Sequence, residues 1–355
     1  MARPTRAVLN PDALRHNLAR VRDYAPRSRV MAIVKADGYG HGLEWAARHL
    51  ADADAFGVAS VEEGGRIRAA NIRQPVALLE GFYSADELTR IAQQRLEPVL
   101  HSHEQVAAME AFRGEPINVW IKLDTGMHRL GFAAADAATV LARLKRCGSV
   151  AEVRVMSHLA SADDLADPAT PAQLETFIAS APAELVRSLA NSAGIVGWPA
   201  CHFDWVRPGI MLYGVSPMLG RSAEQLGLKP VMTLETQLIA IHRRRKGDPI
   251  GYGGAWRCPE DMPIGVAAIG YGDGYPRHAV PGTPVMVGGR LASLVGRVSM
   301  DMITVDLRAC QNARVGERVV VWGEGLPVEQ VAASAGTIGY ELLCHVTARV
   351  PRVER

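Results

Sequence analysis

The sequence predicts an α/β protein, a parallel (β/α)8 barrel followed by a smaller, mostly β domain. Two observations support this prediction. Over residues 10–215, short apolar runs alternate with amphipathic helical segments, as in repeated βα units. After Tyr213, longer alternating or apolar runs are separated by turn residues. We expect the barrel over residues 1–225 and the β-rich domain over residues 226–355, and the first residues, up to about residue 9, could add a strand to the second domain.

Eight short segments are candidates for the barrel strands, the number that closes a TIM-type barrel. Asn10 and Pro11 suit the N-cap and first position of the helix that precedes them. The alternative is a doubly wound open sheet, but the first predicted strand is not followed by G-x-G-x-x-G or by an acidic residue at the dinucleotide spacing. The segments are Val30–Val34, Phe56–Ala59, Pro75–Leu79, Pro98–His101, Asn118–Lys122, Val153–His158, Val186–Ala190 and Asp204–Arg207.

The second domain is predicted from five longer runs. Gly288-Gly289 between two of them is typical of a hairpin turn. A helix is expected near Pro327–Ala335, before a basic C-terminal tail. The predicted strands are Val231–Ile241, Gly265–Ile269, Pro284–Val287, Leu291–Val298 and Arg318–Trp322.

Composition favours a small-molecule ligand. The 39 Lys and Arg residues nearly balance the 37 Asp and Glu residues, so neither nucleic acid nor an anionic membrane is expected as a partner. The start of the chain lacks the apolar run of a secretory signal, and no stretch approaches the ~20 apolar residues of a membrane span, which predicts a cytoplasmic protein. The five cysteines form no C-x-x-C pair, so we expect reduced thiols and no metal site.

Polar residues at the ends of the predicted strands are candidates for chemistry. Lys35 ends a buried strand and enters a glycine-rich turn, where burial favours the neutral amine that can form a Schiff base. Taken alone, such a lysine is as often an ion-paired rim residue. In a barrel, however, the C-terminal ends of all strands converge on one face, where Ser192 and the amides near Gly209 could bind a phosphate. The other strand-end candidates are Lys122, Asp124, Arg129, His158 and Arg207.

These motifs resemble the alanine racemase family, and the resemblance spans essentially the whole chain. The matching segments are Val34–Gly42 around the lysine, Lys122–Phe132, Asn191–Ala193, Val206–Gly214, Gly251–Gly253 and Gly296–Asp301.

The resemblance implies pyridoxal 5′-phosphate as the cofactor and two bases. Lys35 would hold the cofactor and act on one face of the substrate Cα, while Tyr252 would act on the opposite face, since inversion needs a base on each side. A phenol is mostly protonated near neutral pH, so Tyr252 would be assisted by a chain through His158 to Arg207. Arg207 would also donate to the pyridine nitrogen and keep it unprotonated.

The family pattern implies further roles. The phosphate would be held by Tyr39, Ser192, Tyr340 and the backbone at Gly209 and Ile210. Arg129 would reach the cofactor hydroxyl or the substrate carboxylate, positioned by Lys122, which is carbamylated in many members. The backbone amide of Met300 would hold the substrate carboxylate. The remaining implied residues support the site or line the substrate channel: Tyr271 as inner gate, with Asp163, Arg277, Arg297, Asp301 and Ile338.

The resemblance also implies a homodimer whose active site is shared, with Tyr252 and Met300 supplied by the neighbouring subunit. The predicted activity is interconversion of L- and D-alanine, for peptidoglycan or in alanine catabolism. Alternatives are racemisation of serine or another small amino acid, decarboxylation, and a non-catalytic pyridoxal-phosphate-binding protein. A decarboxylase would not need Tyr252, and a pure binding protein would not need the second domain. Gly38, His128 and Ser299 depart from residues common in the family, which affects the carboxylate pocket and channel rather than a proton-transfer group.

Overall fold

The structure is a computed structural model that describes residues 3–355. Its contacts divide the chain into two compact units. We call the unit of residues 15–212 and 216–228 the barrel. The other unit, here the β domain, joins the chain up to Leu14 with residues 213–215 and 229–355.

The barrel closes through eight parallel strands. Each strand pairs with the next one along the chain, including β5 with β6. The pairing of β10 with β2 closes the ring. Every predicted segment overlaps one of these strands, so the predicted (β/α)8 barrel is confirmed. A two-residue strand, β7 (Phe132–Ala133), lies beside β6. The eight strands are β2 (Arg29–Ile33), β3 (Ala55–Val58), β4 (Val76–Leu78), β5 (Leu96–Leu100), β6 (Ile117–Asp124), β8 (Val150–Met156), β9 (Arg187–Ser188) and β10 (Trp205–Val206).

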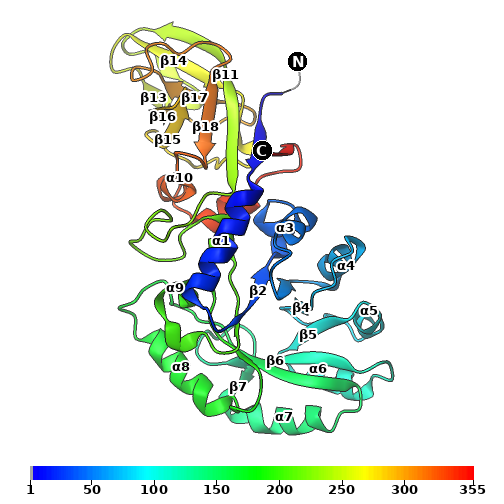
Figure 1. Ribbon diagram of the computed structural model, residues 1–355. Coiled ribbons are helices and arrows are strands. Elements are labelled where there is room, and N and C mark those ends of the chain that lie inside the picture. Colours follow the sequence, from blue (N-terminus) through cyan, green and yellow to red (C-terminus); the bar gives the residue numbers. More distant parts are fainter. Residues whose placement is uncertain (1–2) are drawn as a thin grey trace. The chain divides into compact units, whose positions relative to one another are not determined.

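Helices follow the barrel strands along the chain (Figure 1). The first helix begins where the sequence predicts, because Asn10 Oδ1 accepts from the Ala13 amide at 3.0 Å and Pro11 opens the helix. Ser60 and Ser102 cap two further helices in the same way. The helices are α1 (Pro11–Tyr24), α2 (Lys35–Tyr39), α3 (Leu43–His49), α4 (Val61–Ala69), α5 (Glu87–Gln93), α6 (His103–Ala111), α7 (Ala137–Lys145), α8 (Ala169–Ser180) and α9 (Ser192–Gly197).

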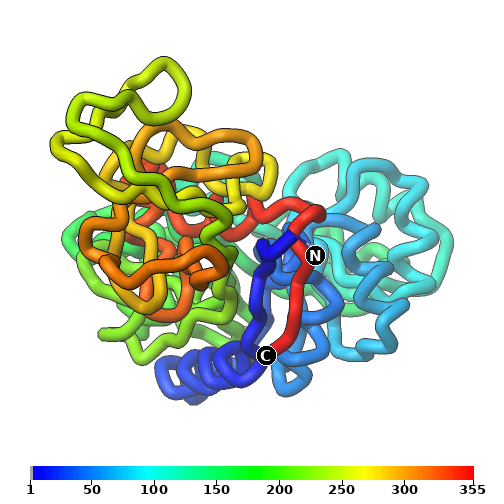
Figure 2. Tube along the Cα trace, turned by 90° about the horizontal axis from the view of Figure 1, so that it is seen from above, coloured from blue at the N-terminus to red at the C-terminus, as the bar shows by residue number. Residues whose placement is uncertain are grey.

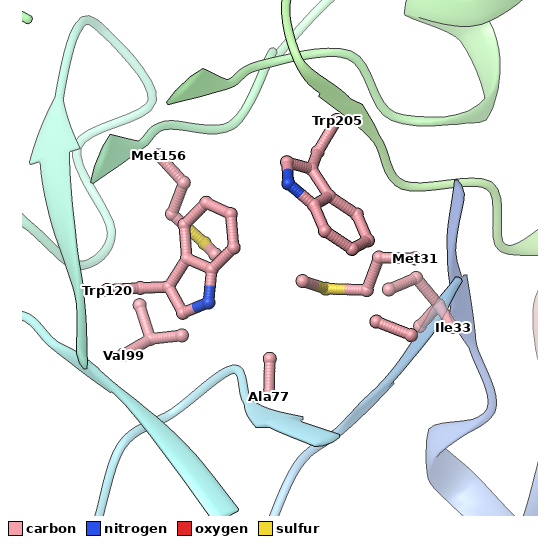
Figure 3. Packing of buried hydrophobic residues seen from close by; sticks show 8 residues of the cluster. Met31, Ile33, Ala77, Val99, Trp120, Met156 and Trp205 are labelled. Atoms are coloured by element: carbon pink, nitrogen blue, oxygen red, sulfur yellow. The ribbon is translucent and has the colours of Figure 1, made fainter. Parts of the chain in front are cut away.

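The barrel interior is a packed core (Figure 3). Trp120 and Trp205 meet edge to face with ring centroids 6.3 Å apart, beside Met31 and Met156. The buried carboxylate of Glu97 accepts from Trp120 Nε1 at 3.0 Å. Because side chains fill the interior, chemistry is confined to the rim at the strand ends.

The β domain is built on an eight-stranded sheet with two short helices, α10 (Val328–Ser334) and α11 (Gly339–Cys344). Gly288 and Gly289, with φ of 54° and 79°, form the predicted hairpin turn between β15 and β16. A small hairpin joins β12 (Pro249–Ile250) and β13 (Trp256–Arg257). The sheet runs in the order β14 (Met262–Ala267), β17 (Ile303–Asp306), β16 (Arg290–Val295), β15 (Pro284–Val287), β18 (Arg318–Trp322), β11 (Met232–Arg244), β1 (Arg6–Leu9) and β19 (Arg352–Glu354).

The two ends of the chain meet in this sheet. Strand β1 pairs antiparallel with β11 and parallel with β19. Figure 2 shows the first and last strands, blue and red, side by side. The basic C-terminal segment, which the sequence presents as a tail, is therefore an edge strand. Its apolar content is too low to predict this, and its pairing with β1 creates the strand.

Three further observations bear on the site. Within residues 3–355, no helix is long and apolar enough to cross a membrane. None of the five cysteines, all of which lie within that range, forms a disulfide. In the same part of the chain, no group of three or more His, Cys, Asp or Glu side chains is arranged to hold a metal ion.

Candidate active site

Lys35 lies two residues beyond the buried end of β2 and is itself half-buried. The five residues after it, Ala36–Gly40, all have positive φ, between 51° and 79°. An L-residue in this left-handed region costs ~1–2 kcal/mol, so the turn persists only where other groups hold it. Two backbone hydrogen bonds contribute, from the Gly38 amide to the Val34 carbonyl and from the Gly42 amide to the Asp37 carbonyl, both at 2.8 Å.

Neutral hydrogen-bonding groups gather at the ends of β2, β9 and β10. The hydroxyl of buried Ser192 accepts from the Gly209 amide at 2.8 Å and from the Met211 amide at 3.5 Å. A Cβ at Gly209 would overlap the Tyr39 hydroxyl, so only glycine permits this approach. Tyr39, Ser192 and Gly209 thus form one cradle, with Ile210 next in the chain, and its hydroxyls and amides suit a phosphate.

Arg207 follows β10 and is buried. Its guanidinium donates to Ser188 Oγ at 2.5 Å, to the Leu189 carbonyl at 3.2 Å and to the Ser157 carbonyl. Among the described residues, no carboxylate pairs with it. Burial lowers the pKa of Arg207 to about 10, which still leaves it protonated at neutral pH.

Lys122 and His158 lie within the same positive field. Burial, followed by the charges of Arg207, Arg129 and Lys35, lowers the pKa of Lys122 to about 8, and Glu80 opposes this. Burial and the charges of Arg207 and Lys122 hold the pKa of His158 well below its usual range. His158 is therefore a neutral imidazole at pH 7, with one nitrogen able to donate and the other to accept.

The loop after β6 carries Arg129. Asp124 Oδ1 organises this loop by accepting from the amides of Gly126, Met127 and His128 at 3.0–3.1 Å. Arg129 itself is exposed, and no ion pair within residues 3–355 engages it. Asp163, on a later loop of the barrel, is half-buried, and its carbonyl accepts from the Leu219 amide at 3.1 Å.

In the β domain, Tyr252 lies on the turn between β12 and β13 with 65% of its surface exposed. Glycines flank it on both sides. A Cβ at Gly253 would lie 3.6 Å from Arg297 Nη1, and a Cβ at Gly251 would lie 3.4 Å from the Arg297 amide nitrogen. The turn that carries Tyr252 therefore packs along the segment that carries Arg297.

Tyr271 and Met300 lie on two loops of the β domain that are bonded to each other. The Tyr271 amide donates to the Ser299 carbonyl at 3.0 Å, and the Gly272 amide donates to the Met300 carbonyl at 2.9 Å. Asp301, next to Met300, is paired with Arg349 at 2.5 Å. Arg277, Ile338 and Tyr340 are exposed residues of the same domain, and the bonds between these two loops do not include them.

The structure adds residues that the sequence analysis does not single out. Ser188 is a fully buried hydroxyl within a predicted strand, a signal that could have identified it. Asp273 is buried and pairs with Arg3 at 2.5 Å and Arg349 at 2.8 Å, two arginines at opposite ends of the chain that no local pattern connects. Glu63 follows Ser60 at the capping-box spacing, and its carboxylate accepts a hydrogen bond from the amide of Ala36, the residue after Lys35.

Comparison with known proteins places both domains in one family. The model for the N-terminal domain of alanine racemase matches residues 9–217, and the model for its C-terminal domain matches residues 231–354. The alanine racemases of Nitrosococcus oceani and Vibrio cholerae are 57% and 50% identical to this chain, over 98% and 97% of its length and 98% and 96% of theirs. The crystal structure of the biosynthetic alanine racemase from Pseudomonas aeruginosa matches with a TM-score of 0.97 at 47% identity, covering 99% of each chain. The chain belongs to the alanine racemase family, and its relatives' activity makes it an isomerase.

Proposed function

We propose that this protein interconverts L- and D-alanine with pyridoxal 5′-phosphate, as a homodimer in the cytoplasm. The observation that carries the proposal is the state of Arg207, a buried guanidinium with only neutral acceptors around it. It follows a barrel strand, as do Lys35 and the cradle of Tyr39, Ser192 and Gly209. An amine, a fixed cation and a set of neutral donors match the aldehyde, the ring nitrogen and the phosphate of this cofactor.

The residues have distinct binding roles in this proposal. The Lys35 amine holds the aldehyde carbon, Arg207 donates to the ring nitrogen, and the cradle holds the phosphate together with Ile210 and Tyr340. When bound, the cofactor delocalises the electron pair that remains on the substrate Cα after its proton is removed. Because Arg207 stays protonated at neutral pH, it donates to the ring nitrogen and leaves that atom without a proton of its own. Arg129 and the Met300 amide bind the substrate carboxylate.

Inversion requires proton transfer on both faces of the substrate Cα. Lys35 Nζ takes or gives the proton on one face, and Tyr252 Oη does so on the other. His158 is uncharged, so it can accept from Arg207 with one ring nitrogen and donate to the Tyr252 oxygen with the other. This chain stabilises the phenolate without placing a formal charge on the imidazole.

We propose that the two bases at each site come from different subunits. The barrel of one subunit supplies Lys35, and the β domain of the other subunit supplies Tyr252. Several apolar side chains of the β domain are exposed, as expected of a surface that is covered by a second chain. They include Tyr252, Met300, Met302, Ile338 and Tyr340.

Racemisation of alanine by the purified, cofactor-loaded protein tests the activity, with serine as the comparison substrate. Absence of alanine racemisation would refute it. Tyr252→Phe tests the second base, because it should retain the visible absorbance of the bound cofactor. The kcat/KM of racemisation should fall by ~10²–10⁴-fold in both directions alike, since a general base is removed and the two enantiomers are equally stable. Full activity in this variant would contradict the two-base assignment.

Mixing two inactive variants tests the shared site. A hybrid dimer of Lys35→Ala and Tyr252→Phe contains one site with both defects and one site with neither. Random exchange of subunits should therefore restore about a quarter of the wild-type activity. No recovery, despite exchange verified by differently tagged subunits, would show that each chain supplies both bases to its own site.

The proposed physiological role is the supply of D-alanine for peptidoglycan. It is supported by the similarity to the Pseudomonas aeruginosa protein, which is described as biosynthetic. Expression in a bacterial strain that requires D-alanine should remove that requirement. If growth still requires D-alanine while the expressed enzyme is active in extracts, a catabolic role is favoured.

A further inference from the structure

The turn that follows Lys35 has a left-handed backbone conformation, which is unusual next to a functional lysine. Three of its residues, Ala36, Asp37 and Tyr39, carry a Cβ and have φ of 54°, 54° and 51°. L-residues avoid this region and visit it mainly as single residues, so the sequence alone does not favour a run of this kind. The turn must be held by groups outside it.

Glu63 of α4 provides one such restraint. Its Oε1 accepts from the Ala36 amide at 2.9 Å, and its Oε2 accepts from the Ala59 amide at 2.8 Å. The first amide belongs to the peptide bond that leaves Lys35, and the second lies just beyond the end of β3. Both partners are donors, so the arrangement needs two acceptor oxygens on one side chain, which a carboxylate offers and an amide does not.

Arg66 provides the second restraint, one helical turn further along α4. Its Nη2 donates to Asp37 Oδ1 at 2.8 Å, and its Nε and Nη2 donate to the two oxygens of Glu44 at 2.7 and 2.8 Å. The same Asp37 Oδ1 accepts from the Leu43 amide at 3.1 Å, where α3 begins. Arg66 therefore ties the middle of the turn to the helix that follows it.

Residues three apart on a helix share a face, so one face of α4 presents an acceptor to the start of the turn and a donor to its centre. Figure 1 shows α3 and α4 as neighbours, and their residues are in contact. We propose that Glu63 and Arg66 are positioning residues that keep the turn left-handed and thereby aim Lys35 and Tyr39. The roles of Lys35 and Tyr39 rest on the proposed function. The restraint of the turn by Glu63 and Arg66 does not depend on it.

Without Glu63, the Ala36 amide loses its acceptor, and the peptide after Lys35 is free to rotate. Lys35 and Tyr39 lie at the two ends of the turn, so such a rotation moves the amine and the phosphate cradle relative to each other. A misplacement of about 1 Å at a reacting group can reduce catalysis by ~10²-fold. The loss should appear in cofactor retention and in kcat, whereas KM for alanine should change little because Arg129 and Met300 are untouched.

Glu63→Gln is the test, and Glu62→Gln is its matched control. Glu62 is the preceding residue of the same helix, and its carboxylate pairs with Arg90 at the surface. In Glu63→Gln we expect about 10-fold faster loss of the bound cofactor, measured by its visible absorbance, and a fall in kcat of ~10–100-fold. Glu62→Gln should stay within about twofold of the wild type in both measurements.

Hydrogen exchange of the segment 34–42, measured by mass spectrometry with and without cofactor, gives a readout that does not depend on activity. Exchange should accelerate in Glu63→Gln and not in Glu62→Gln. If the wild type binds no cofactor, the proposed function is refuted, but the hydrogen-exchange comparison still tests whether Glu63 restrains the turn. If Glu63→Gln fails to fold, Arg66→Met takes its place, with Arg90→Met as its control. Equal exchange, cofactor retention and kcat in the test and control variants would overturn the proposal, as would a loss of thermal stability alone.

Discussion

Removal of the Ser188 hydroxyl is expected to lower both the stability of the fold and the pKa of Arg207, because this hydroxyl accepts a hydrogen bond from the buried guanidinium. Ser188 Oγ accepts from Arg207 Nη1 at 2.5 Å and donates to the Trp205 carbonyl at 2.8 Å. Ser188→Ala leaves a buried cation with one acceptor fewer and leaves a backbone carbonyl without its donor. A hydrogen bond to a charged group contributes ~1.5–3 kcal/mol and a neutral one ~0.5–1.5 kcal/mol, so the free energy of unfolding should fall by about 2–4 kcal/mol.

The same substitution should change the pH dependence of catalysis. The lost acceptor favours the neutral guanidine, so the pKa of Arg207, already lowered to about 10 by burial, falls further. The alkaline limb of kcat/KM should therefore move to lower pH, by more than about one pH unit if ~2 kcal/mol is lost, since one unit corresponds to ~1.36 kcal/mol. Urea unfolding gives the stability, and the optical rotation of alanine across pH 7–10.5 gives the profile.

Ser157→Ala is the matched control. Its hydroxyl is also buried and bonds to the Leu123 carbonyl at 2.8 Å, but Arg207 contacts only the main-chain carbonyl of Ser157, which the substitution retains. We expect Ser157→Ala to lower stability without moving the alkaline limb. The reasoning is refuted if the two variants have the same limb.

Three further predictions concern stability. Because folding lowers the pKa of Lys122 to about 8, the folded state disfavours its protonated form. The free energy of unfolding of the wild type should then rise relative to Lys122→Met between pH 8 and about 10.5, by up to ~3 kcal/mol, as urea titrations at each pH would show. Asp273→Asn breaks the pairs with Arg3 and Arg349 and should cost ~3 kcal/mol, at the low end for a buried pair because both arginines are partly exposed. Arg95→Gly should raise the free energy of unfolding by ~0.5–1 kcal/mol, which a higher melting temperature would show. Arg95 is exposed and has φ of 50°, a conformation that glycine adopts more readily than arginine.

Each of these has a contrasting variant. Lys145→Met, at an exposed position of α7, should show no such dependence on pH, and a flat difference for Lys122 itself would indicate that it is carbamylated and carries no proton. Glu324→Gln breaks an exposed pair with Arg355 and should cost less than ~1 kcal/mol. Gln93→Gly, at the last residue of α5, should destabilise by up to ~1 kcal/mol, opposite in sign to Arg95→Gly.

Most of the barrel strands were predictable because a buried parallel strand is rich in apolar residues. The two-residue strands β9 and β10 also lie within predicted strands, at Val186–Ala190 and Asp204–Arg207, although polar residues interrupt both segments. Strand β19 was not predictable, because only its pairing with β1, more than 300 positions away in the chain, makes it a strand. The left-handed conformation of the turn after Lys35 was missed for a similar reason, since Ala36 has no preference for positive φ, and side chains of α4, distant in the sequence, bond to Ala36 and Asp37.

Residues at the candidate site were predictable where barrel geometry collects them. Lys35, Ser192 and Arg207 follow three strands, and a closed barrel brings strand ends to one rim. The role of Tyr252 came only from the family resemblance, because no local pattern marks a surface tyrosine between glycines as a base. Glu63 acts through backbone amides of other segments, and such contacts leave no periodic signal in the sequence.

The pairing of β1 with β19 also constrains how the protein is made. Strand β1 precedes the barrel in the chain, yet one of its two neighbours in the sheet, β19, follows the barrel. The barrel lies between them, so it can fold while the chain is still growing, whereas β1 keeps an open edge until β19 has been translated. An edge that stays unpaired for this long can pair with other chains, which makes the interval before β19 is made a period of exposure to aggregation.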